Sequence, residues 1–115
     1  MANVYKNAFY APTGTLAETI YTCPTEARAI FQTVQITVTS GTKIVQLYIF
    51  DNSTSTQNLI SYQSIAGPAT VNLLKGSVIL EESDQLRIAT DNSSGISGTA
   101  ALLEVSRVYI PDVGA

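Results

Sequence analysis

The strongest constraint on the fold is an alternation of apolar and polar residues that begins near residue 30. Over residues 33–39, valine and isoleucine alternate with threonine and glutamine, and residues 43–50 place Val45, Leu47 and Ile49 on one face at the same spacing. Successive side chains of a β-strand point to opposite faces, so this period of two predicts two strands that each turn an apolar face to the core. The short Ser40-Gly41-Thr42 segment between them predicts an antiparallel hairpin.

The rest of the chain consists of similar short runs separated by turn signals. Only residues 24–30 could form a helical turn, and we interpret them as a loop that leads into a strand. Further strands are predicted at about residues 4–10, 16–22, 59–65, 69–74, 78–80, 85–90 and 99–110. Short strands at this spacing predict an all-β fold, an antiparallel β-sandwich that is jelly-roll-like and has eight or nine short strands. The predicted core comprises Val34, Ile36, Val38, Val45, Leu47, Ile49, Leu86, Ile88, Leu103 and Val105.

A chain of 115 residues has the length of one domain, so we expect a single β-sandwich domain over residues 1–115. Residues 1–12 are a candidate N-terminal arm because aromatic residues precede a Pro-Gly turn signal. This segment either pairs within its own domain or adds a strand to a neighbouring subunit. Residues 111–115 begin with a proline and are expected to form a flexible tail.

Composition excludes several classes of function. The chain has no histidine and a single cysteine, Cys23, so it offers no internal disulfide, no Cys/His zinc site and no histidine-assisted nucleophile. We therefore expect no enzyme and no cofactor, with Cys23 as a small buried filler. The six basic residues are scattered and the net charge is −3, which argues against nucleic-acid binding. We see no signal peptide and no apolar stretch long enough to span a membrane, so a soluble protein made in a reducing compartment is expected.

Two groups of polar residues could carry chemistry. The Asp-Asn-Ser segments that begin at Asp51 and Asp91 offer oxygen ligands, but each has one carboxylate, so loop capping is favoured over a metal site. Glu81, Glu82 and Asp84 form an acidic cluster, and paired carboxylates are the groups that glycosidases use. Three acids at one turn are more typical of a solvated connection, and no metal or catalytic residue is predicted.

Aromatic residues give the candidate interface. Tyr48 and Phe50 lie opposite the predicted core face of their strand, which is therefore apolar on both sides. Such a strand in a small sandwich needs a cover, and a subunit contact is the favoured one. The candidate interface residues are Val4, Tyr5, Phe9, Tyr10, Tyr48 and Phe50. Exposed tyrosines could instead stack on sugars, which leaves a carbohydrate-binding or receptor-binding module as an alternative.

Several segments resemble those of small structural proteins from tailed-bacteriophage virions. They are residues 2–8 (ANVYKNA), 20–24 (IYTCP), the long alternating strand at 29–39, and 76–88 (GSVILEESDQLRI). The resemblance spans nearly the whole chain, but the segments describe strands and turns and no site. One departure is Ser83, which stands where the acidic turn of that group usually has glycine. The last strand also runs past its usual end, over residues 107–115.

The resemblance implies a non-enzymatic structural protein of the virion, synthesised in the host cytoplasm. It suggests a capsid decoration (cement) protein that binds the major capsid protein from outside as a homo-oligomer, commonly a trimer. The alternative within the same class is a protein associated with the neck, tail or fibre. Neither membrane nor nucleic acid is an expected partner.

Overall fold

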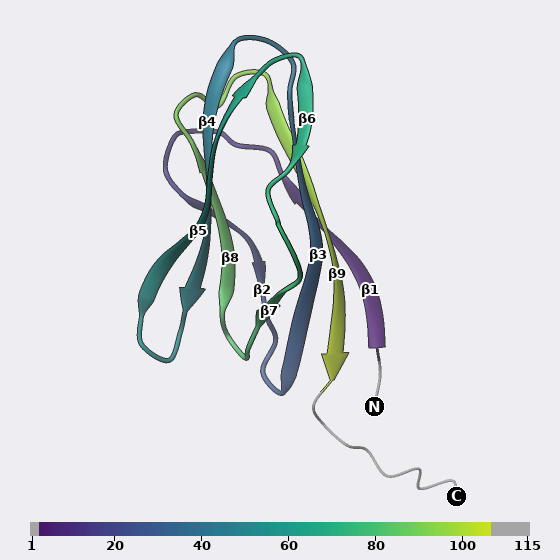
Figure 1. Cartoon of the computed structure of the whole chain (residues 1–115). Helices are drawn as coiled ribbons and strands as arrows, with labels where there is room; N and C mark the ends of the chain where they lie inside the picture. The colour runs from purple at the N-terminus through teal and green to yellow at the C-terminus, as the bar shows by residue number, and fades with distance from the viewer. Residues whose placement is uncertain (1–2, 107–115) are drawn as a thin grey trace, which may run out of the picture.

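The computed structural model describes residues 3–106 and shows two antiparallel sheets packed face to face (Figure 1). The strands are β1 (Asn3–Tyr10), β2 (Glu18–Thr22), β3 (Ala27–Val38), β4 (Thr42–Asp51), β5 (Thr56–Ala66), β6 (Ala69–Asn72), β7 (Val78–Leu80), β8 (Gln85–Thr90) and β9 (Ile96–Ser106). Sheet A has the order β1-β9-β3-β6, with β7 also pairing with β3, and sheet B has the order β2-β8-β4-β5. Among the described residues no helix is long and apolar enough to cross a membrane.

The strand order is that of a jelly roll. First and last strands pair (β1 with β9), second and second-last pair (β2 with β8), and the middle of the chain closes with β4 beside β5. This nesting of antiparallel pairs in two facing sheets is the double Greek key of jelly rolls. The predicted all-β, jelly-roll-like sandwich is therefore confirmed, with nine strands in the described part. Residues 107–110 of the predicted last strand and the predicted tail at 111–115 lie outside the described residues.

The hairpin predicted across Ser40-Gly41-Thr42 is wrong. Strand β3 belongs to sheet A and β4 to sheet B, so this connection crosses from one sheet to the other. Gly41 has a φ of 74°, which glycine adopts without strain, and the Thr39 amide donates to the Gly95 carbonyl. The tight hairpin is instead β4–β5, where Asp51 lies opposite Thr56. Alternation could not distinguish these cases because it specifies which face is buried and does not specify the paired strand.

Most of the predicted core is buried between the sheets. Val34, Ile36, Val38, Val45, Leu47, Leu86 and Ile88 are fully buried, and Ile49 packs against them at the margin. Leu103 and Val105 are exceptions, because the inward positions of β9 are taken by Ala100, Leu102 and Glu104. The run from Ala100 to Leu103 is apolar at both parities, so alternation could not assign its faces. Leu103 and Val105 lie on the outer face and are half-buried.

Gly98 lets large side chains meet across β9 on the inner face. It lies opposite Tyr10 of β1 and Ile36 of β3. A Cβ at this position would lie 2.5 Å from Ile36 Cδ1 and 3.3 Å from Tyr10 Cβ. The space above the glycine is therefore filled from both neighbouring strands.

One end of the sandwich is held by a buried carboxylate. Asp84 Oδ1 accepts from the Asn52 amide at 3.1 Å, and Oδ2 accepts from the Glu81 amide at 3.1 Å. The Cys23 amide donates to the Asp84 carbonyl, so three turns meet here. Ser83, the departure in the acidic turn, has a φ of 66°, in the left-handed region that glycine adopts freely.

Candidate interaction surface

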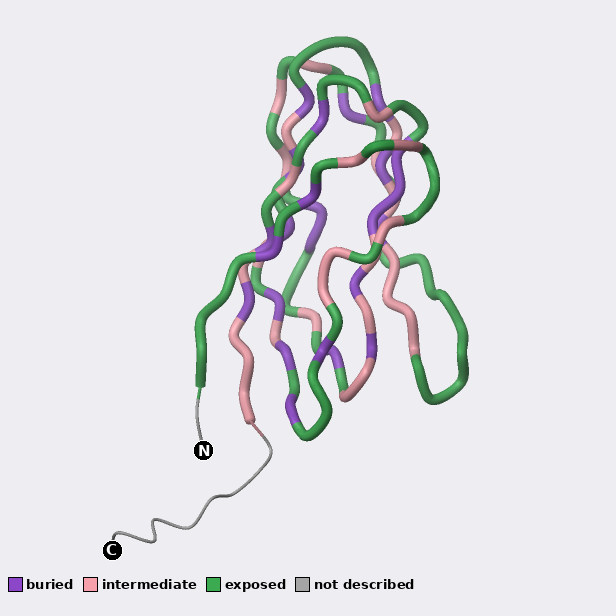
Figure 2. The backbone as a smooth tube through the Cα atoms, turned by 180° about the vertical axis from the view of Figure 1, so that it is seen from behind, coloured by how far each residue is buried: buried purple, intermediate pink, exposed green. Residues whose placement is uncertain are grey.

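Strand β1 displays most of the predicted N-terminal interface residues. It pairs with β9 of its own chain from Asn3 opposite Val105 to Tyr10 opposite Gly98. Tyr5 is 78% exposed and Phe9 69% exposed, both on the outer face of sheet A, and Val4 is exposed on the other parity. Figure 1 shows β1 at the margin of sheet A, and Figure 2 shows its first half exposed. The predicted arm, as far as it is described, is thus a strand of its own domain.

Tyr10 cannot contribute to a surface, and its assignment to the interface is wrong. Its side chain is only 2% exposed because it points inward, above Gly98. Its hydroxyl has no hydrogen-bond partner among the described residues. Burial, with a smaller contribution from the negative charge of Glu18, raises the pKa of Tyr10 to about 12. Tyr10 is therefore a core residue.

A row of apolar side chains crosses the outer face of sheet A. Tyr5 of β1 lies opposite Leu103 of β9, Leu103 opposite Ile30 of β3, and Ile30 opposite Ile79 of β7. We call these four residues the apolar row. Its ends are well exposed, with Ile79 at 57%, and its middle is half-buried. Leu103, Ile30 and Ile79 were not among the predicted interface residues, since their alignment depends on which strands pair.

The face around the apolar row carries little charge. By strand register, Arg28 is the one charged residue of the described strands that lies on this face, and the other polar residues of the face are Thr, Gln, Asn and Ser. A shallow hollow of about 140 Å³ lies beside Tyr5, and its lining also includes Lys6, Asn7, Gln32, Ala101 and Leu102. A surface with so few charges loses little hydration energy when a partner covers it.

Part of the outer face of sheet B, around Phe50, is covered by side chains of the same sheet. The Arg87 guanidinium carbon lies 4.2 Å from the centre of the Phe50 ring. Arg87 also donates to Gln57 Oε1 at 3.0 Å, to Gln85 Oε1 at 2.7 and 2.9 Å, and to Thr19 Oγ1 at 3.2 Å. Its contacts thus reach all four strands of the sheet. The predicted interface residue Phe50 is half-buried because the chain itself supplies a cover.

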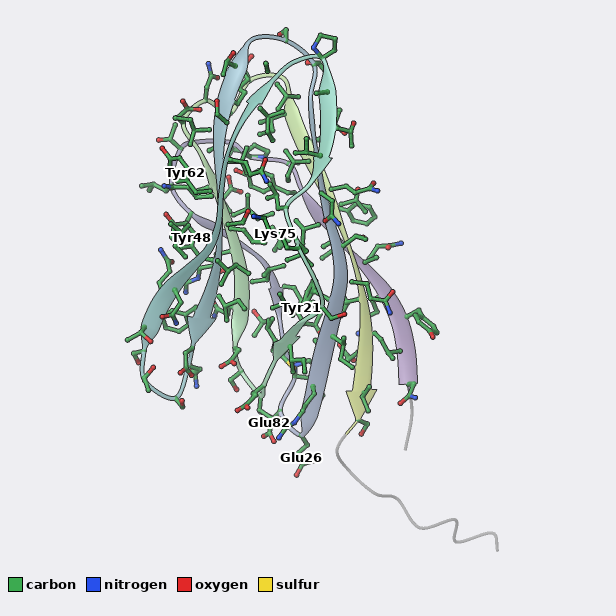
Figure 3. The ribbon with its side chains drawn as sticks, viewed as in Figure 1. Tyr21, Glu26, Tyr48, Tyr62, Lys75 and Glu82 are labelled. Carbon is green, nitrogen blue, oxygen red and sulfur yellow. The ribbon has the colours of Figure 1, made fainter. Side chains whose placement is uncertain are left out.

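Tyr48 and Tyr62 lie on this same outer face. Figure 3 shows both rings on the side of sheet B away from sheet A. Tyr48 is half-buried and its hydroxyl lies 2.7 Å from Gln46 Oε1, whereas Tyr62 is exposed. A hollow of about 390 Å³ opens nearby, between residues 60–63 of β5 and residues 73–78. The six predicted interface residues therefore do not form one surface. Four lie on β1 in sheet A, and Tyr48 and Phe50 lie on β4 in sheet B.

A polar cluster closes the sandwich beside β1. Glu104 points inward from β9, accepts from Lys6 Nζ at 3.1 Å and accepts a short hydrogen bond from the Tyr21 hydroxyl. Burial favours a higher pKa for Glu104, but these two donors and the Lys6 charge outweigh it and lower the pKa. Burial and the bond to Glu104 raise the pKa of Tyr21. The cluster ties β1 and β2 to β9.

The two Asp-Asn-Ser segments act as loop caps. Asp51 accepts from the Ser53 amide and hydroxyl and from the Thr54 hydroxyl, and Asp91 accepts from the Ile44 amide. The bonds from Ser53 and Thr54 lower the pKa of Asp51. In the described part of the chain no three Asp, Glu, Cys or His side chains gather in a way that could hold a metal ion.

Comparisons with known proteins give fold-level likeness. No model of a known protein family matches the sequence, and no curated protein matches it. A solved structure of a Bacillus endospore appendage protein, from a family of disulfide-linked pili, shares 14% identity over 93% of this chain and 87% of that one, with a TM-score of 0.51. This likeness shows a shared fold. A structure of infectious bursal disease virus, Gx strain, contains a chain with 12% identity and a TM-score of 0.42, matched over 91% of this chain and 30% of that one. This likeness is too weak to show a shared fold.

Proposed function

We propose that this protein is a non-enzymatic structural protein of a virion that binds the capsid exterior as a homo-oligomer and stabilises it. The observation that carries the proposal is the apolar row on the charge-poor outer face of sheet A. Tyr5 and Ile79 at its ends are large, exposed and apolar, as residues that dominate protein interfaces commonly are. The resemblance to tailed-phage virion proteins supports the major capsid protein as the partner.

A matched pair of variants tests this role. Ile79→Glu places a charge in the apolar row, and Ser97→Glu places the same charge on the same face outside it. We expect Ile79→Glu to weaken binding to purified capsids of the virus that carries this gene at least tenfold, and Ser97→Glu less than threefold. Co-sedimentation with capsids measures both. Wild-type protein that does not bind capsids would overturn the proposal, as would equal effects of the two variants.

A subunit of an extracellular appendage is the second candidate, favoured by the fold shared with the pilus protein. That pilus is disulfide-linked. Here Cys23 is 1% exposed, and burial raises the pKa of its thiol, so a disulfide to another copy through Cys23 would require local opening. Electron microscopy of the purified protein distinguishes the candidates, because an appendage subunit would form filaments and a decoration protein discrete oligomers.

A further inference from the structure

Strand β1 differs from the other sheet edges in being both long and regular. Strands β2, β6 and β7 have 5, 4 and 3 residues, and β2 contains a register shift. Strand β5 has 11 residues but is interrupted at Ile60, where the register with β4 shifts. Strand β1 has 8 residues in unbroken register with β9. No strand of residues 3–106 pairs with its other edge (Figure 1).

Proteins usually protect such an edge with a proline, a bulge or an inward-pointing charge. Strand β1 has no proline and no bulge. Its inward-pointing charge is Lys6, which is paired with Glu104 of its own chain. The edge therefore offers unpaired backbone donors and acceptors to another strand, and only a strand satisfies them in series.

The sequence of β1 complements itself in one antiparallel register. With a two-fold axis at Asn7, Tyr5 lies opposite Phe9 of the second copy and Phe9 opposite its Tyr5. These two pairs lie on the outer face of sheet A, where the rings are now exposed. Lys6 then faces Ala8 of the second copy, so no like charges oppose each other. Aromatic pairs directly across two strands stabilise a sheet.

The neighbouring registers are worse. An axis at Lys6 brings the two lysines directly opposite each other and places Phe9 opposite Asn3. An axis at Ala8 pairs Phe9 with Asn7 and leaves Tyr5 without an aromatic partner. Moving one copy by a single residue relative to the other would place outward-facing residues of one strand opposite inward-facing residues of its partner. The register at Asn7 alone pairs both exposed aromatic residues of the strand.

We propose that β1 joins two copies of this chain in an antiparallel pair centred on Asn7, which makes sheet A continuous across the dimer. The contact is isologous and closes at two copies. It places the apolar rows of both copies on the same face and replaces the trimer that the resemblance implies with a dimer. The inference rests on the proposed homo-oligomer and is independent of capsid binding.

A cysteine scan of β1 in the full chain tests the register. Asn7→Cys places two thiols opposite each other, with Cα atoms about 4.5 or 5.5 Å apart, within disulfide reach. Asn3→Cys, on the same face, leaves its two thiols roughly 27 Å apart in this register. Under mild oxidation we expect more than half of Asn7→Cys to migrate as a covalent dimer on non-reducing gels and less than a tenth of Asn3→Cys. The buried Cys23 leaves the wild type as an uncrosslinked control.

Sedimentation of the unmodified chain completes the test. We expect a wild-type dimer whose dissociation constant rises at least tenfold in Phe9→Asp and less than threefold in Ile79→Glu. A wild-type monomer or trimer would overturn the inference, and so would equal crosslinking of the two cysteine variants or an unaffected Phe9→Asp dimer. A dimer that crosslinks at Asn7 but does not bind capsids would support this inference and reject the proposed function. A trimer that binds capsids would support the proposed function and reject this inference.

Discussion

The outer faces of the two sheets both carry aromatic residues, yet one of these residues on sheet B, Phe50, has a cover supplied by the chain itself. On sheet B, Arg87 lies over Phe50 and hydrogen-bonds to side chains of three strands. On sheet A, Tyr5 and Phe9 remain largely exposed. An outward aromatic residue therefore does not by itself indicate an interface. What matters is whether neighbouring strands supply a long side chain that reaches over it.

The largest expected effect tests whether the two faces belong to one cooperative unit. Phe31 of sheet A is fully buried and packs edge-on against Tyr21 of sheet B, with ring centres 5.3 Å apart. Phe31→Ala should lower the free energy of unfolding by about 3–5 kcal/mol through lost packing and a residual cavity. Urea unfolding followed by circular dichroism and by tyrosine fluorescence should give one midpoint. Two separate midpoints would show that the sheets unfold independently.

A smaller effect compares the two faces directly. Arg87→Ala should lower the free energy of unfolding by about 1 kcal/mol, because it removes a cation–π contact and several hydrogen bonds. Tyr5→Ala should change it by less than about 0.5 kcal/mol at protein concentrations too low for association. Urea titrations of both variants measure the difference. If both variants lost the same free energy of unfolding, the Tyr5 side chain would stabilise its own chain as much as the Arg87 side chain does.

The smallest expected change in stability concerns Glu104, the carboxylate of β9 that pairs with Lys6 of β1. The pKa of Glu104 is lowered from its usual 4.5 in the folded protein, so its stabilising contribution is present above pH 4.5 and is lost as the pH falls through the folded pKa. The contribution should be below about 1 kcal/mol, since the Lys6 side chain is 44% exposed and water screens the pair.

Glu104→Gln keeps the shape of the side chain and removes its titration. Its free energy of unfolding should therefore fall less than that of the wild type between pH 7 and pH 3. Urea unfolding at both pH values measures this difference. Parallel losses in the two proteins would show that Glu104 does not contribute to the acid sensitivity.

Alternation was sufficient to predict the fold class, and it failed where both parities are apolar. Leu103 and Val105 were placed in the core and Tyr10 on the surface, and the structure reverses all three. Leu103 and Tyr10 each stand beside another apolar residue that could take the inward position, whereas beside Val105 the inward position is occupied by Glu104, which binds Lys6 and Tyr21. The choice depends on strands distant in sequence, such as the packing of Tyr10 over Gly98.

The candidate surface was predictable only in part for a related reason. Tyr5 and Phe9 stand out in the sequence as aromatic residues near the N-terminus. The apolar row combines residues from four strands, and its alignment follows from pairing between β1, β9, β3 and β7. Arg87 as a cover for Phe50 also depends on β8 lying beside β4. Such contacts are long-range and have no signature in a single segment.

The close approach across Gly98 has a consequence for how this protein can diverge. A side chain at position 98 would collide with Ile36 and Tyr10, and a smaller residue at either neighbour would leave a void above the glycine. The three positions therefore constrain one another's size. Among homologues we expect them to co-vary as a unit, with a larger residue at position 98 appearing only where positions 10 and 36 have become smaller.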